Sequence, residues 1–449
     1  MGGFNVGAAT AISSTTGLGT GIDVSSYVQA ALSQLSGPLA LAEQQQAQLS
    51  NQTTALNTLN SNLQSLLSAA QSLNDPAGQF NSLDVTSSDP SLLAASATAG
   101  SAQGNHTVTI NSLATTSSEY SADQATSSTP TNTGSFQIQV GTGTPVTINV
   151  TSANNTLAGI ASAINASGAD VTASVINDAG GARLSIVSNL SGAPGDLTIS
   201  NDTVGLGFTK AVTGVNASLT VDGIPISSTS NAVTGAINGV TLNLIAADPN
   251  TQVDLTIQPD VTQAEAAINS FVSAYNTVVS GLDSQFAVDP TTGQQGPLAT
   301  DSSATIAQDL VLSAATYAPG GNSTIPNLAS LGLNFNDDGT ITVDQGTLAN
   351  ALQNNFAAVQ NFLQGSSTAF APNLVNTLQN LTEPSAGVIA VDLTGISDQQ
   401  QSLSQQINDF QAQLAIQQQT LTTYYSQIDT TLEELPELQA QVASQLSSL

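Results

Sequence analysis

Apolar residues recur every seven positions near both ends of the chain, and this spacing predicts long helices. Toward the N-terminus the repeat comprises Val28, Leu35, Ala42, Leu49, Leu56, Leu63 and Ala70. Toward the C-terminus it comprises Ile407, Leu414, Leu421, Ile428, Leu435, Val442 and Leu449. A sustained seven-residue repeat indicates a left-handed supercoiled seam against another helix. We therefore expect helices at 24–36 and 38–73, and a C-terminal helix that kinks or restarts at Pro436.

The middle of the chain changes to an alternation of apolar and polar residues, which predicts half-buried strands. The expected strands lie at 105–112, 135–140, 146–150, 219–222, 224–227, 240–246 and 252–258. The dipeptide Asp222-Gly223 favours a hairpin turn, and helical spacing of apolar residues predicts one helix within 157–164. The remaining expected elements are helices at 261–286, 301–316, 347–364 and 367–381, with a hairpin at 333–343.

This order of elements predicts an α+β multidomain fold in which helices from both ends enclose inserted β-rich domains. The expected parts are terminal coiled-coil helices at 1–40 with 400–449, a helical bundle at 41–75 with 261–399, a β-rich domain at 76–114 with 213–260, and an inserted β-rich domain at 115–212. Because each terminal segment carries an apolar seam that needs a partner, the two ends of the chain should meet in space.

The charge balance excludes several classes of function. The 449 residues include 2 Lys and Arg against 31 Asp and Glu, which gives a formal net charge of -29. Two cations cannot line a groove for nucleic acid or clamp a transferring phosphate. The chain has no cysteine, so we expect neither disulfides nor a thiolate nucleophile.

The same composition favours an extracellular location. Freedom from cysteine together with many uncharged polar residues is typical of extracellular bacterial surfaces. The first residues carry no basic region followed by an apolar run, so we expect export without a Sec signal peptide. No apolar stretch approaches the length of a membrane span, and we expect no membrane insertion.

The candidate chemical sites have simpler structural interpretations. Residues 336–344 resemble half of a calcium loop but lack its bidentate glutamate, so an Asp-Gly turn explains them. His106 has no neighbouring nucleophile motif, and Glu433, Glu434 and Glu437 are typical of a solvated helix face. We therefore expect no catalytic site, metal or cofactor, and no enzymatic activity. The sequence does not assign ion-pair partners to Arg183 and Lys210.

The helical seams have two interpretations. They form either a core within one chain or a contact with other subunits, and seams at both extreme ends favour the second. The candidate partner-binding residues are the members of the two repeats apart from Ala42, Ala70 and Leu449.

Five motifs occur in an order that resembles one known family. They are Gly17–Val24, the strand at 104–115 that ends in Leu113-Ala114, the segment 156–188, the stretch 219–279, and the segment 331–348. Together they are similar to the flagellar hook-associated protein 2 (FliD) family of filament caps, over nearly the whole chain. The segment 156–188 is similar to a repeat that is inserted in flagellins and related proteins.

The resemblance implies a homo-oligomeric ring at the distal tip of the bacterial flagellum, beneath which exported flagellin folds and inserts. It also implies contacts with hook-filament junction proteins and with a cytoplasmic flagellar export chaperone that holds the C-terminal helix. Export through the flagellar type III pathway, without a cleaved signal, and a role in adhesion for some members are further implications.

One departure from the family is that glutamine stands where basic residues are usual on the terminal helices, as at 44–46 and 417–419. Any partner contact that uses basic residues is therefore in question. Other classes that share some features are a hook-filament junction protein, a flagellin, a surface adhesin and an acidic glycoside hydrolase.

Overall fold

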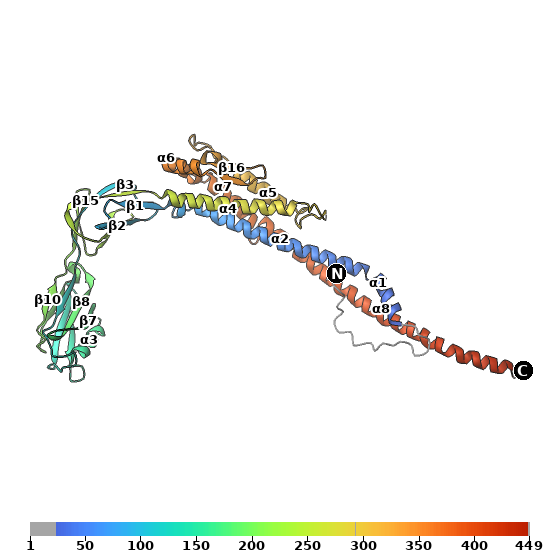
Figure 1. Ribbon diagram of the computed structural model, residues 1–449, viewed down its shortest axis with the longest axis horizontal. Helices are drawn as coiled ribbons and strands as arrows, with labels where there is room; N and C mark the ends of the chain where they lie inside the picture. The colour runs from blue at the N-terminus through green and yellow to red at the C-terminus, as the bar shows by residue number, and fades with distance from the viewer. Residues whose placement is uncertain (1–23, 292, 448–449) are drawn as a thin grey trace. The chain divides into compact units, whose positions relative to one another are not determined.

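The structure is a computed structural model that describes residues 24–291 and 293–447 (Figure 1). Their contacts divide the chain into two compact units. The helical unit contains residues 24–71, 270–344 and 361–447 of the described part, and the β-rich unit contains 72–269 and 345–360. The opening motif up to Asp23, and Leu449, lie outside the described residues.

Long amphipathic segments form the helices. Their bounds are α1 (Val24–Leu35), α2 (Gly37–Asn74), α4 (Val261–Phe286), α5 (Ser302–Ala315), α6 (Gln345–Gln364), α7 (Phe370–Thr382) and α8 (Val388–Ser447). Asp301 caps α5, because its carboxylate accepts a hydrogen bond from the backbone N–H of Ala304. The helices at both ends of the chain and after Val261 confirm the expectation from the apolar spacing.

The expected restart at Pro436 is wrong, because α8 continues through this residue to Ser447, and the expected kink stays a prediction. Proline removes one backbone donor and crowds the carbonyl four residues earlier. Every described residue from 431 onward is exposed, so water can satisfy the carbonyl of Leu432 that loses its partner. Exposure therefore makes the proline tolerable here.

Aromatic rings form much of the core of the helical unit. Phe370 of α7 stacks on Phe362 with ring centroids 5.6 Å apart and meets Phe271 of α4 edge-on at 5.7 Å. The hairpin β16 (Leu333–Phe335) with β17 (Ile341–Val343) docks on α4. The Tyr275 hydroxyl donates to the carbonyl of Gly339 at 3.1 Å, so α4 holds the turn of the hairpin.

The outer β-rich domain consists of two antiparallel sheets. Its strands are β1 (Leu83–Ser87), β2 (Leu93–Ala97), β3 (Gly104–Ser112), β11 (Ala217–Val221), β12 (Ile224–Ser228), β13 (Ala232–Ile237), β14 (Val240–Leu244) and β15 (Asp248–Pro259). The strand orders are β1-β15-β3-β11-β12 and β13-β14-β2. Inward-facing residues such as Val108, Leu219 and Leu255 build one core. Asp222 and Gly223 both have positive φ, as a type I′ hairpin turn requires.

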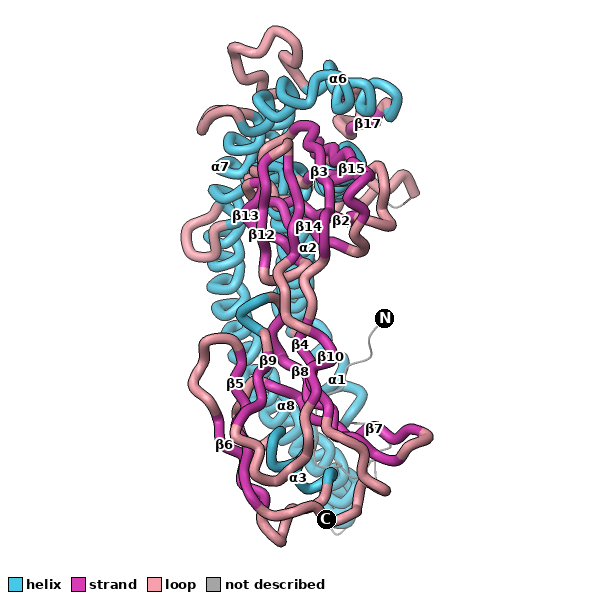
Figure 2. Tube along the Cα trace, turned by 90° about the vertical axis from the view of Figure 1, so that its left-hand side faces the viewer, coloured by secondary structure: helices cyan, strands magenta, loops and turns pink. Residues whose placement is uncertain are grey.

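The inserted β-rich domain draws all its strands from 116–212 (Figure 2). Its elements are β4 (Thr116–Tyr120), β5 (Gly134–Val140), β6 (Val146–Val150), α3 (Leu157–Asn165), β7 (Val171–Asp178), β8 (Gly181–Ser191), β9 (Leu197–Ser200) and β10 (Thr209–Val212). They form sheets in the orders β10-β4-β8-β7 and β6-β5-β9. A separate core forms around Phe136, Ile160 and Leu184. The proposed domain boundaries at 114 and 213 stay a prediction.

Candidate interaction surfaces

The N-terminal helices pack on the C-terminal helix within one chain. Leu39 and Ala42 of α2 form a small buried cluster with Leu403 and Ile407 of α8. The flanking residues Leu49, Phe410 and Leu414 pack against this cluster. On α1, Val28 is buried and the Tyr27 ring lies 6.0 Å from that of Tyr425 on α8. The expectation that the two ends of the chain meet is thereby confirmed for the described residues.

The candidate partner-binding residues therefore fall into different environments. Leu56 and Leu63 are wholly buried in the helical unit, as are Val28 and Ile407 to within a few per cent. Leu49, Leu414, Leu421 and Ile428 are half-buried. By contrast, the side chains of Leu35, Leu435 and Val442 are 50%, 45% and 53% exposed. Their role in binding a partner stays a prediction.

The last turns of α8 carry an exposed apolar face, which we call the distal stripe. Its members are Leu432, Leu435, Leu438, Val442 and Leu446. Leu438 is 60% and Leu446 72% exposed. At 100° per residue these side chains fall within one side of the helix, while Glu433, Glu434 and Glu437 fall on the other. The distal stripe is thus a solvated amphipathic helix surface that could bury apolar area against a second helix.

The chain's two basic side chains belong to the β-rich unit, whereas the distal stripe belongs to the helical unit. Arg183 and Lys210 both belong to the inserted β-rich domain, on β8 and β10. Arg183 pairs with Asp123 at 2.7 Å and Asp178 at 3.2 Å, and Lys210 pairs with Asp196 at 2.9 Å. No lysine or arginine occurs in the helical unit. Contacts of this unit with a partner must therefore be apolar or hydrogen-bonded, or use basic groups of the partner.

His106 pairs with a carboxylate at a hairpin turn. Its Nδ1 lies 2.7 Å from the carboxylate of Asp222, in the turn between β11 and β12. The hydrogen bond with His106 holds the pKa of Asp222 below its usual value, and the backbone N–H of Thr107 contributes to the same shift. The Thr107 hydroxyl approaches Asp222 rather than His106. The contact between a nucleophile and a base that a catalytic triad requires is therefore not made by these residues.

The calcium-like segment forms a hairpin turn. The carboxylate of Asp338 accepts hydrogen bonds from the Thr340 hydroxyl at 2.6 Å and the Thr340 backbone at 3.0 Å. These bonds lower the pKa of Asp338, the side-chain bond most. Within the described part of the chain, no group of three or more His, Cys, Asp or Glu residues is arranged to hold a metal ion.

Sequence reasoning missed a pair of carboxyl groups in the helical unit. Asp392 of α8 lies beside Asp301, the cap of α5. Burial raises the pKa of Asp392, and the negative charge of Asp301 raises it further. The two residues are far apart in sequence and carry no motif, so only the packing of α5 on α8 reveals them.

Among the described residues, none of the helices combines the length and hydropathy that are needed to cross a bilayer.

Family comparisons match the chain in three segments. The family model "Flagellar hook-associated protein 2 N-terminus" matches residues 20–117, and "Flagellar hook-associated protein 2 C-terminus" matches residues 214–437. Between them, the "Flagellin hook IN motif" matches residues 135–189. The third match covers β5 to β8 of the inserted β-rich domain.

Relatives are similar over most of the chain. The B-type flagellar hook-associated protein 2 of Pseudomonas aeruginosa is 29% identical, over 88% of this chain and 89% of its own. The flagellar hook-associated protein 2 of Escherichia coli K12 is 28% identical, over 94% of this chain and 95% of its own. The crystal structure of the D1-D2-D3 domains of the flagellar cap protein FliD from Escherichia coli is similar with a TM-score of 0.62 and 27% identity, over 76% of this chain and 99% of that one. The chain therefore belongs to the flagellar hook-associated protein 2 family.

Proposed function

We propose that the chain is a structural cap at the distal tip of the bacterial flagellar filament. The observation that carries this proposal is the pair of family matches that flank the inserted β-rich domain, in the family's own order. The likeness to the flagellar cap protein of Escherichia coli spans all but 1% of that solved chain and supports it. Another axial protein or an adhesin is less favoured, because neither accounts for both family matches.

The cap would be a ring of several copies of the chain. A cyclic ring uses heterologous contacts, in which different patches of neighbouring subunits meet. The distal stripe supplies an apolar patch for such contacts or for packing against helices of the filament. Each residue of the stripe leaves at least 36% of its area for a partner to cover.

Exported flagellin would fold and insert beneath this ring, and the helices would meet the hook-filament junction proteins during assembly. We propose export through the flagellar type III pathway without a cleaved signal peptide. A cytoplasmic export chaperone would cover the distal stripe before export, since an exposed apolar helix face favours aggregation. The role is structural, and no cofactor takes part in it.

Complementation of a cap-deficient strain tests the proposal. The gene is deleted in the source bacterium, and the full chain is returned as the parent, as Val442→Asp or as Glu434→Gln. We expect filaments in electron micrographs with the parent and with Glu434→Gln, which lies on the acidic side of α8. Val442→Asp places a charge in the distal stripe and should leave flagellin monomers in the medium.

Two results would each contradict one part of the proposal. Normal filaments after deletion of the gene would show that the chain is not the filament cap. Normal filaments with Val442→Asp would leave the cap function intact and exclude the distal stripe as its assembly surface.

A further inference from the structure

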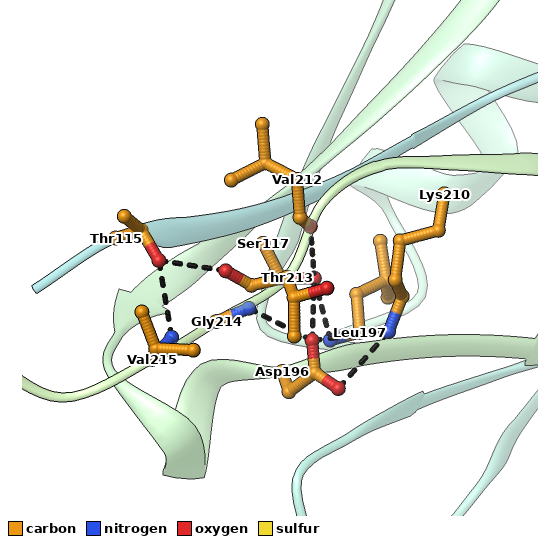
Figure 3. Close-up of polar contacts among 9 residues, drawn as sticks. All are labelled: Thr115, Ser117, Asp196, Leu197, Lys210, Val212, Thr213, Gly214 and Val215. Atoms are coloured by element: carbon orange, nitrogen blue, oxygen red, sulfur yellow. Dashed lines mark hydrogen bonds and ion pairs between the residues drawn. The ribbon is translucent and has the colours of Figure 1, made fainter.

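Three chain segments meet where the inserted β-rich domain joins the outer one (Figure 3). Two of them, 113–116 and 213–216, are the connections by which the chain enters and leaves the inserted domain. The third, 191–197, links β8 to β9 inside the inserted domain. All three belong to the β-rich unit, so their contacts determine how its two domains are held together.

Thr115 fastens the two connections to each other. Its backbone N–H donates to the carbonyl of Val215 at 3.0 Å. Its hydroxyl donates to the carbonyl of Thr213 at 2.6 Å and accepts from the Val215 N–H at 3.0 Å. The carbonyl of Thr115 accepts from Gly192 N–H at 3.0 Å, which adds the third segment.

Asp196 lies at the centre of this junction (Figure 3). Its Oδ1 accepts hydrogen bonds from the Gly214 N–H at 2.9 Å and from Lys210 Nζ at 3.0 Å. Its Oδ2 accepts from the same Nζ at 2.9 Å. The hydroxyl of the fully buried Ser117 lies 3.0 Å from Oδ1 and accepts from the Leu197 N–H. The carboxylate of Asp196 in the β8–β9 segment therefore holds the exit connection at Gly214, together with Ser117 of β4 and Lys210 of β10.

The β8–β9 segment also touches the outer domain directly. The Ser191 hydroxyl donates to the carbonyl of Thr229 in the outer domain at 2.7 Å, and the Ala193 N–H donates to the side chain of Asn216 in the exit connection at 2.8 Å. Gly192 has a φ of +76° in this segment, and a Cβ there would lie 2.7 Å from Thr229 Cα. The two domains are thus in close contact at this point, with no space for a side chain between them.

Charge strengthens the junction. Burial alone would raise the pKa of Asp196, but hydrogen bonds from Gly214 and Lys210 outweigh burial and hold the pKa below its usual value. Lys210 also faces Glu119 across the β4–β10 ladder. Lys210 is one of the chain's two Lys and Arg residues, and it is placed between these carboxylates. Charge-assisted hydrogen bonds are about twice as strong as neutral ones.

We propose that Asp196 and Lys210 form a clasp that fixes the orientation of the inserted β-rich domain relative to the outer β-rich domain. Asp196 is a positioning residue in this arrangement, because it joins the exit connection at Gly214 to the β8–β9 segment, whose Ser191 contacts the outer domain at Thr229. The clasp is a property of the single chain, so it does not depend on the cap function.

Distance measurements between the two domains test the clasp. The chain has no cysteine, so spin labels can be attached at introduced cysteines alone. Thr144→Cys in the β5–β6 turn and Thr234→Cys on β13 place one label in each domain at exposed positions. We expect a single narrow distance distribution by pulsed electron paramagnetic resonance in the full chain. Asp196→Asn and Lys210→Met should each broaden it at least twofold.

The matched control is Asp178→Asn. It removes a partner of Arg183, the other basic residue, inside the same domain but outside the junction, and should leave the distribution unchanged. Amide exchange in β7 and β8 reports whether the inserted domain is folded. Lys210→Met keeps the Ser117 and Gly214 donors to Asp196, so it decides the question if Asp196→Asn does not fold. Unchanged distributions in both folded variants, or unfolding of the domain by Lys210→Met, would overturn the proposal.

Discussion

Two leucines on the same helix distinguish the intramolecular seam from the assembly surface. Leu403 is 8% exposed, in the cluster with Leu39, Ala42 and Ile407, whereas Leu438 is 60% exposed in the distal stripe. Truncating a buried leucine to alanine costs about 2–5 kcal/mol, and the small size of this cluster places Leu403→Ala near the lower value. Leu438→Ala should change stability by less than about 0.5 kcal/mol.

Amide hydrogen exchange measures this difference locally, which matters because the chain has two units that need not unfold together. A loss of about 2 kcal/mol accelerates exchange about 30-fold in α2 and α8 around the cluster, since each 1.4 kcal/mol is about a factor of ten. We expect this acceleration in the Leu403→Ala monomer and parent-like exchange in the Leu438→Ala monomer. Sedimentation should show weaker assembly for Leu438→Ala.

The reasoning fails if Leu438→Ala accelerates exchange in the monomer as much as Leu403→Ala does. In that case the distal stripe packs within its own chain. It also fails if Leu403→Ala leaves exchange unchanged, because the cluster would then contribute nothing to holding α2 on α8.

Three further predictions concern charge and polar contacts. Crowding of carboxylates in an assembly raises their pKa, so protonation stabilises the assembly at low pH, and this stabilisation is lost as pH rises through the raised pKa. Assembly should therefore strengthen with mild acid and, because salt screens the repulsion, with added salt. Sedimentation velocity from about pH 4.5 to 8 checks this, and dissociation of the assembly by salt at neutral pH would contradict it. Burial raises the pKa of Glu119 despite the attraction of Lys210, so ionisation of Glu119 opposes folding at neutral pH. Glu119→Gln should therefore raise the midpoint of thermal unfolding of the inserted domain at pH 7. The effect should be smaller below pH 4.5, the ordinary pKa of a glutamate. Burial raises the pKa of Tyr275 to about 12. Tyr275→Phe removes the hydrogen bond to the carbonyl of Gly339, so the free energy of opening measured by amide exchange in β17 should fall by about 1 kcal/mol, while exchange in the inserted domain stays unchanged.

Periodicity predicted the terminal helices well, because a seven-residue repeat places apolar side chains along one side of a helix. It could not tell which seam residues find a partner in the same chain. Leu63 belongs to the N-terminal repeat and Val442 to the C-terminal repeat, yet Leu63 is wholly buried and Val442 is 53% exposed. The difference depends on where a second helix happens to lie, which the spacing along one helix does not contain.

Strands with polar inward positions were harder to predict. In β4 the buried positions are Ser117 and Glu119, so the strand lacks the apolar alternation that marks β3 or β5. The burial of these two residues depends on distant partners, Asp196 and Lys210, that no local pattern indicates. The clasp was invisible in the sequence for this reason.

Asparagine side chains that replace a strand neighbour were also missed. The amide of Asn231 accepts from the N–H of Ala114 at 2.7 Å and donates to its carbonyl at 3.0 Å. Asn276 makes the same two contacts with Ile341. Such pairs join segments that are far apart in sequence, and a chain rich in asparagine gives no sign of which ones do so.

The placement of both Lys and Arg residues in one domain has a consequence for proteolysis. Trypsin cleaves after lysine and arginine, so it can cut this chain only after Arg183 and Lys210. Both residues lie in strands of the inserted domain and are held by aspartates, so cleavage requires local opening of that domain. The helical unit offers trypsin no site at all. The rate of cleavage by trypsin therefore measures the opening of the inserted domain without a label, and it can be measured in the intact chain or in an assembly of many copies.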